Sequence, residues 1–149
     1  MIAVCGGGGD LDAPTASLAE QVGAELAKAG AVVVCGGLGG VMEAVCRGAR
    51  SAGGRTVGIL PGTSPSAANP YIDVPIATGL SHGRNVVIVN TADGVIALPG
   101  SYGTLSEVAL ALKMDKPVVS VGGPYKDANV HEAHDAADAV RRVMKLIAV

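Results

Sequence analysis

Aromatic residues are nearly absent from this chain of 149 residues, which has no phenylalanine, no tryptophan and three tyrosines. Apolar residues nevertheless make up 49% of the sequence, so the core must be built from valine, alanine, leucine and isoleucine. These residue types favour valine-rich strands covered by alanine-rich helices. The length predicts a single domain over residues 1–149, because one hydrophobic core suffices for a chain of this size.

Charge is also scarce. Charged residues make up 16% of the chain, the net charge is -2, and no basic run is longer than Arg141-Arg142, which argues against nucleic acid as a partner. No apolar stretch reaches the roughly 18 residues that span a bilayer, and Met1 leads into an apolar segment without the charged start of a secretory signal. We therefore expect a cytoplasmic protein that does not bind a membrane.

Metal-binding patterns are weak as well. The cysteines are odd in number and have no Cys-x-x-Cys spacing, which favours free buried thiols over disulfides or a zinc site. They are Cys5, Cys35 and Cys46. His131 and His134 lie across an expected junction between a strand and a helix, with no partner elsewhere in the sequence, so we expect no metal site.

Strand-like and helix-like segments alternate along the chain, which is the pattern of βαβ units and predicts a parallel sheet. The expected strands cover residues 2–5, 31–35, 56–60, 94–98 and 117–121, with a further short strand at 130–133. The expected helices cover residues 15–29, 40–52, 83–90, 104–114 and 135–147, the last capped by Asp135. The fold class is therefore α/β, a three-layer Rossmann-like arrangement with a doubly wound parallel sheet.

One connection, from Pro61 to Pro75, is long, rich in proline and without a clear period. It is either a mobile lid over a ligand or a surface excursion between two strands. Tyr71 is its only aromatic residue, and a tyrosine in a lid could stack on a base.

Three glycine clusters follow three of the expected strands. They are Gly6 to Gly9, Gly36 to Gly40 and Gly100 to Gly103. In a doubly wound sheet the carboxyl ends of the strands form one edge, and ligands bind there at the point where the strand order reverses. Each cluster alone could be a tight turn, but their shared position predicts one crevice lined by all three.

The glycine patterns differ from those of two common nucleotide sites. The run Gly37-Leu38-Gly39-Gly40-Val41-Met42 lacks the third spaced glycine of a dinucleotide site, and the next strand ends in Leu60-Pro61-Gly62 instead of an acid for a ribose hydroxyl. No Gly-Lys-Ser/Thr occurs, which excludes a Walker-type triphosphate site. A phosphomonoester or small nucleotide is the better candidate ligand.

The run from Pro99 to Glu107 carries the strongest functional signal, because a glycine turn that opens a helix presents free amides to a phosphate. Thr104 and Glu107 add a hydroxyl and a carboxylate, although their spacing also fits a capping box in which Glu107 only caps its own helix. Arg84 follows another turn and could bind phosphate or ribose hydroxyls, or could be a solvated arginine at a helix start.

These motifs resemble those of the "lonely guy" (SLOG) superfamily, which includes cytokinin-activating phosphoribohydrolases, once labelled putative lysine decarboxylases, and molybdenum cofactor carrier proteins. The family signature is Pro-Gly-Gly-x-Gly-Thr-x-x-Glu, and in this chain its second glycine is Ser101. The segment 81–85 ends in Arg84-Asn85 where the phosphoribohydrolases have Arg-Lys, and the turn at 36–44 is similar to that of the carrier branch, with Glu43 after Met42.

The resemblance implies that Glu107 acts on a ribose and that Arg84 assists it, so these two are the candidate catalytic residues. The predicted ligand-binding residues are Gly6, Gly7, Gly8, Gly36, Gly37, Gly39, Gly40, Met42, Arg84, Asn85, Pro99, Gly100, Ser101, Tyr102, Gly103, Thr104 and Glu107. The crevice has no lysine placed for a Schiff base, which argues against a decarboxylase.

Two functions follow as hypotheses. The first is a binding or carrier protein for a phosphate-bearing, nucleotide-like ligand, either a nucleoside monophosphate or the molybdenum cofactor, with no other cofactor required. The second is a nucleoside 5'-monophosphate phosphoribohydrolase that hydrolyses the N-glycosidic bond. The low charge also predicts an apolar surface that pairs with a second copy, and the resemblance implies a homodimer or homotetramer.

Overall fold

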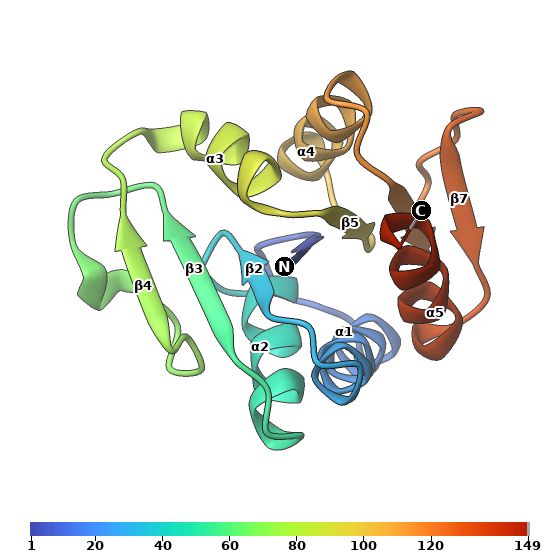
Figure 1. Cartoon of the computed structure of the whole chain (residues 1–149). Helices are drawn as coiled ribbons and strands as arrows, with labels where there is room; N and C mark the ends of the chain where they lie inside the picture. The colour runs from blue at the N-terminus through green and yellow to red at the C-terminus, as the bar shows by residue number, and fades with distance from the viewer. Residues whose placement is uncertain (149) are drawn as a thin grey trace.

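Seven parallel strands form one sheet in the computed structural model, which describes residues 1–148 (Figure 1). The strands are β1 (Ile2–Cys5), β2 (Val33–Cys35), β3 (Thr56–Leu60), β4 (Val74–Ala77), β5 (Gly94–Ala97), β6 (Val118–Val121) and β7 (Val130–Ala133). Their order is β4-β3-β2-β1-β5-β6-β7, and every neighbouring pair is parallel. The direction of winding reverses between β1 and β5, so the expected doubly wound Rossmann-like fold is confirmed.

Helices cover both faces of the sheet. One face is covered by α1 (Ala13–Lys28), α2 (Val41–Ser51) and α5 (Ala136–Ile147), and the other by α3 (Arg84–Thr91) and α4 (Tyr102–Lys113) (Figure 1). Short 3-10 turns lie at Pro65–Ala67 and Ser81–Gly83. All five predicted helices are present, with ends shifted by at most two residues. In residues 1–148, every helix is too short or too polar to cross a bilayer.

Strand β4 was not predicted, because Pro70 and Pro75 and the small polar residues around them hide it in the sequence. It pairs with β3 at the edge of the sheet, where Pro75 lies opposite Gly58. An edge strand tolerates proline since one side of its backbone has no partner strand. The segment predicted as one irregular loop therefore contains a 3-10 turn and ends in the first residues of a strand.

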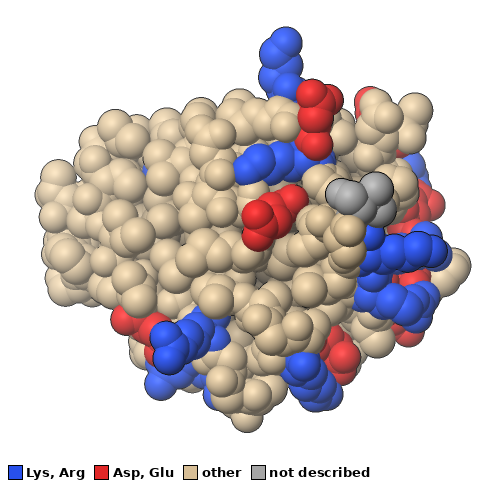
Figure 2. Space-filling view, viewed as in Figure 1, with Lys and Arg blue, Asp and Glu red and all other residues tan. Residues whose placement is uncertain are grey.

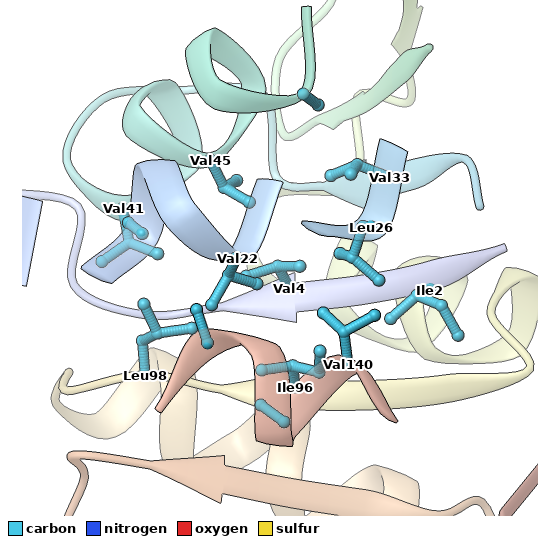
Figure 3. Packing of buried hydrophobic residues seen from close by; sticks show 14 of the residues in the cluster. Ile2, Val4, Val22, Leu26, Val33, Val41, Val45, Ile96, Leu98 and Val140 are labelled. Carbon is cyan, nitrogen blue, oxygen red and sulfur yellow. The ribbon is translucent and has the colours of Figure 1, made fainter. Parts of the chain in front are cut away.

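The strands divide the core between the two faces of the sheet. In β1, Ile2 and Val4 pack with α1, α2 and α5, whereas Ala3 and Cys5 pack with α3 and α4. Figure 3 shows Ile2 and Val4 among valine, leucine and isoleucine side chains from the neighbouring strands and helices. The core is therefore built without phenylalanine or tryptophan, and the three cysteines within it are free and buried, as predicted.

Two glycines allow α1 and α2 to cross in backbone contact. A Cβ atom on Gly23 would overlap the carbonyl group of Val45, and one on Gly48 would overlap the carbonyl group of Glu20. Backbone atoms cannot move away as a flexible side chain can. This crossing holds α2 against β2 and thereby fixes the position of the turn that precedes α2.

We predict that Gly48→Ala destabilises the protein by about 2 kcal/mol or more, since the added methyl group forces the two helices apart. This loss exceeds the gain of about 1 kcal/mol that alanine brings to a helix interior. Urea unfolding followed by circular dichroism measures the change. Gly62→Ala is the matched control, because a Cβ atom there meets no other atom. A Gly48→Ala protein as stable as the parent would contradict the backbone contact.

Candidate functional site

Three glycine turns meet at the carboxyl edge of the sheet, where the strand order reverses. They follow β1, β2 and β5. Gly7 links them, because its N–H donates to the carbonyl oxygen of Pro99 at 2.9 Å and its own carbonyl accepts from the N–H of Val41 at 2.9 Å. The crevice predicted from the positions of the glycine clusters is therefore held together by backbone hydrogen bonds.

The turns approach so closely that side chains do not fit between them. A Cβ atom on Gly6 would lie 2.6 Å from a methyl group of Val41, and one on Gly40 would overlap the carbonyl oxygen of Gly7. Gly40 also has a φ of 65°, a conformation that other residues rarely adopt. A Cβ atom on Gly100 would overlap the hydroxyl group of Thr104 and would lie 2.9 Å from the amide nitrogen of Gly7 in the first turn. Glycine at these positions is therefore required by contact between the turns.

The turns enclose a cavity of about 170 Å³. Its lining includes most of the residues that the sequence predicted as ligand contacts: Gly6, Gly7, Gly8, Gly36, Met42, Arg84, Asn85, Ser101, Gly103, Thr104 and Glu107. The lining also includes Val4, Cys5 and His82, which were not predicted as contacts. The location of Cys5 at the cavity could have been predicted from the sequence, because Cys5 is the last residue of β1 and directly precedes the first glycine turn.

The other predicted contacts lie behind or beside the cavity. Gly37 packs against Leu60, and Gly39 and Gly40 lie against the first turn. Pro99 and Gly100 support Gly7 from the third turn. Tyr102 is 86% exposed and lines a neighbouring groove. These residues therefore shape the site or its rim without lining the cavity.

Helix α4 opens at the cavity with unpaired amides. The helix begins at Tyr102, and the side chain of Ser101, the residue before it, makes no capping hydrogen bond. The first N–H groups of a helix have no acceptor within it and carry partial positive charge. Because Thr104 lies inside the helix, Thr104 and Glu107 do not form a capping box. Glu107 instead lies one turn further on and lines the cavity.

Arg84 and Glu107 face the same cavity without pairing. Within residues 1–148, no carboxylate lies within 4.0 Å of the Arg84 guanidinium. Burial raises the pKa of Glu107 to about 7, although the charge of Arg84 opposes this shift. Burial also lowers the pKa of Arg84, with Glu107 opposing. The space between the Arg84 guanidinium and the Glu107 carboxyl group is thus open to a ligand. Such a ligand would place an anionic group against Arg84 and a hydrogen-bond donor against Glu107.

His82 lies at the mouth of the cavity with an exposed side chain. In the described part of the chain, the imidazole of His82 makes no hydrogen bond, so it is free to face a ligand.

Tyr71 does not line the cavity. Its ring lies under the guanidinium of Arg47, 5.6 Å from the ring centre, and its carbonyl oxygen accepts from the hydroxyl of Thr56 at 2.6 Å. The ring packs against the core on the α1 and α2 side of the sheet. Tyr71 therefore fastens the segment before β4 to α2, and the idea that it stacks on a bound base is wrong for this structure.

We predict that Glu107→Gln stabilises the protein in a pH-dependent manner. A carboxyl group whose pKa is raised on folding costs stability once the unfolded chain ionises, so the cost develops from about pH 4.5 and is complete above about pH 7. The gain from glutamine is therefore up to about 3 kcal/mol at pH 8 and much smaller at pH 5. Thermal unfolding across this range measures it.

Glu43→Gln is the control for this test, because it removes a carboxylate from the first turn of α2. Equal stabilisation by Glu107→Gln at pH 5 and pH 8 would contradict a buried carboxyl group at position 107.

Several known proteins are similar to this chain in sequence. An uncharacterised protein of Archaeoglobus fulgidus is 47% identical over 79% of this chain and 78% of its own length. The cytokinin riboside 5'-monophosphate phosphoribohydrolase of Mycobacterium tuberculosis is 38% identical over 70% of this chain. This match spans 60% of the phosphoribohydrolase, which is less than two thirds of its length.

A solved structure matches over nearly the whole fold. The molybdenum cofactor carrier protein of Chlamydomonas reinhardtii superimposes with a TM-score of 0.90 at 35% identity, covering 99% of this chain and 98% of that one. The model of the SLOG cluster4 family matches residues 1–147. The chain therefore belongs to the SLOG cluster4 family.

Proposed function

We propose that this protein binds a phosphate-bearing, nucleotide-like ligand in the cavity at the reversal point of the sheet, and that residues 1–149 act as one binding domain. The observation that carries the proposal is the uncapped start of α4, whose free amides face the same cavity as an arginine without an ion pair. Amides at a helix start and a guanidinium are both suited to phosphate. The likeness to molybdenum cofactor carrier proteins supports a carrier role.

The size of the cavity indicates how such a ligand lies. Pockets that hold a whole drug-sized molecule have volumes of about 300 to 1,000 Å³, whereas this cavity has about 170 Å³. It therefore suits the phosphate end of a ligand. A largely apolar groove between α3 and α4 continues from it, sharing His82, Asn85 and Gly103, and includes Tyr102. The ring system of the nucleotide or pterin extends into this groove.

Glu107 recognises the part of the ligand next to the phosphate. A carboxyl group with a pKa of about 7 is partly ionised near neutral pH. In its ionised form it accepts a hydrogen bond from a ribose hydroxyl or from a ring N–H group. Arg84 at the same time donates to an acceptor on the ligand. The molybdenum cofactor, which combines a phosphate with such a ring, would be the cargo of a carrier protein and not its resident cofactor.

The second candidate function is hydrolysis of a nucleoside 5'-monophosphate, and the carboxylate in the cavity favours it. Cleavage of the bond between base and ribose builds positive charge on the sugar, which Glu107 would stabilise. Water would add to the sugar carbon, and the proton it releases would go to the departing base. The sequence relatives named as phosphoribohydrolases support this reading.

Binding is tested by calorimetry with adenosine 5'-monophosphate, other nucleoside monophosphates and the molybdenum cofactor. We expect at least one of them to bind, and Gly36→Ala to weaken it about tenfold, because a Cβ atom there lies 2.7 Å from both Arg84 Nη2 and Met42 Sδ. Both of these atoms belong to flexible side chains, so the fold survives. Gly62→Ala is the control. Equal affinity in Gly36→Ala and the parent would exclude this cavity as the site.

Turnover is tested by chromatographic detection of free base after incubation with the same monophosphates. A pure carrier releases no base, while a phosphoribohydrolase releases base at a rate that falls at least about a hundredfold in Glu107→Ala. Base release that is unchanged in Glu107→Ala would mean that another group, or a contaminant, is responsible.

We also propose that a second copy of the chain covers the α3 and α4 side of the molecule. The exposed large apolar residues of the described chain are Met1, Val74, Ile76, Leu80, Val86, Tyr102 and Leu105. All but Met1 belong to β4, α3, α4 or the turn before α3. Figure 2 shows few charged side chains over β4, β3 and α3. An uncharged apolar face that is this broad fits a copy of itself.

We predict that Val86→Glu dissociates this assembly, since it places a charge on the exposed side of α3. Light scattering at micromolar concentration is expected to show a dimer or larger assembly for the parent and a monomer for the variant. Gln21→Glu adds a charge to the exposed surface of α1 and serves as control. A parent protein that is monomeric at this concentration would contradict the proposal.

A further inference from the structure

Asn85 lies between α3 and α4 and is only 6% exposed. Its side-chain oxygen accepts a hydrogen bond from Nη1 of Arg84 at 3.0 Å, and its Nδ2 donates to the hydroxyl of Ser106 at 2.9 Å. The hydroxyl of Ser106 in turn donates to the carbonyl oxygen of Gly103 at 2.7 Å. A continuous chain of hydrogen bonds therefore runs from the cation of the site to the first turn of α4.

This series of hydrogen bonds has a fixed direction from donor to acceptor. Arg84 can only donate, so it requires the oxygen of the amide, and the amide nitrogen must then face Ser106. Ser106 accepts from that nitrogen and has its one proton for Gly103. An amide turned the other way would place two donors against each other at Arg84. Asparagine is thus suited to position 85 because it accepts at one end, donates at the other and remains uncharged.

Arg84 has little else to hold it. Its Nε is buried and has no hydrogen-bond partner in residues 1–148, and the same part of the chain offers it no ion pair. A half-buried guanidinium without a carboxylate is costly, and a long side chain with few contacts can adopt several rotamers. The bond to Asn85 is the one side-chain hydrogen bond that restricts it in the described chain.

We propose that Asn85 is a positioning residue that aims the Arg84 guanidinium at the point faced by the amides of α4 while leaving its positive charge unneutralised. This inference rests on the proposed function, because it assumes an anionic ligand between Arg84 and α4. Asn85 acts through Arg84, and both ends of its amide are occupied by protein groups. It therefore sets the affinity for the anion without being its main contact.

The binding test compares three substitutions in calorimetry with adenosine 5'-monophosphate. Asn85→Asp keeps an acceptor for Arg84 but neutralises it, so affinity falls at least about tenfold. Asn85→Ala releases Arg84, and affinity falls by a similar factor. Asn90→Asp, an exposed site on the same helix, adds the same charge outside the chain of bonds and changes affinity less than about twofold. Parent-like affinity in Asn85→Asp would overturn the proposal.

A second measurement does not depend on any ligand. Nitrogen NMR of the guanidinium group distinguishes a held arginine, with separate Nη signals, from one that rotates freely and gives merged signals. We expect separate signals for Arg84 in the parent and in Asn85→Asp, and merged signals in Asn85→Ala. Ser106→Ala removes the hydrogen bond between Asn85 and Ser106 and provides the same test if Asn85→Ala does not fold. Separate Arg84 signals in both Asn85→Ala and Ser106→Ala would overturn the proposal.

The two measurements separate the failure of this inference from the failure of the proposed function. If no monophosphate binds but the signals of Arg84 merge in Asn85→Ala, the positioning role stands and the choice of ligand is wrong. If a monophosphate binds and the substitutions at position 85 change neither affinity nor signals, the proposed function stands and Asn85 has no positioning role.

Discussion

Backbone contact between three glycine turns is the constraint on which the site depends. Gly7 bonds to Pro99 on one side and to Val41 on the other, and glycine at 6, 40 and 100 leaves room for these approaches. The contacts place the start of α4 beside the first turn and bring the second turn within reach of Arg84. An added methyl group at Gly40 would overlap the backbone of Gly7, and one at Gly36 would displace the side chains of Arg84 and Met42. The geometry of the site therefore depends on glycine at these positions.

The electrostatics of the cavity are determined by polar and charged groups that lack a capping or ion-pair partner. The start of α4 has no side-chain cap, Arg84 has no ion pair within residues 1–148, and Glu107 is held near its midpoint of ionisation at neutral pH by burial. Each of these features costs stability in the free protein. A ligand that carries a phosphate and an adjacent hydrogen-bond donor would satisfy all of them together. This combination supports binding, and whether hydrolysis follows depends on Glu107.

Most of the fold was predictable from sequence because valine-rich strands and amphipathic helices have distinct periods and glycine marks their ends. Strand β4 was not predicted, because it contains Pro75 and proline is unusual in strands other than edge strands. The start of α4 was placed two residues late, which made the capping-box reading possible. His82 and the bonds of Asn85 could not be predicted, because they depend on how α3 lies against α4, and Tyr71 was misjudged since its partner Arg47 is distant in sequence.

The amides at the start of α4 are the groups that we expect to bind the phosphate of a ligand. We would first map the backbone amide NMR shifts as adenosine 5'-monophosphate, or the best ligand found, is added. The largest shifts are expected at Gly7, Gly8, Tyr102, Gly103 and Thr104. Shifts that instead gather around Lys145 and His131, at the groove between α5 and β7, would contradict this expectation.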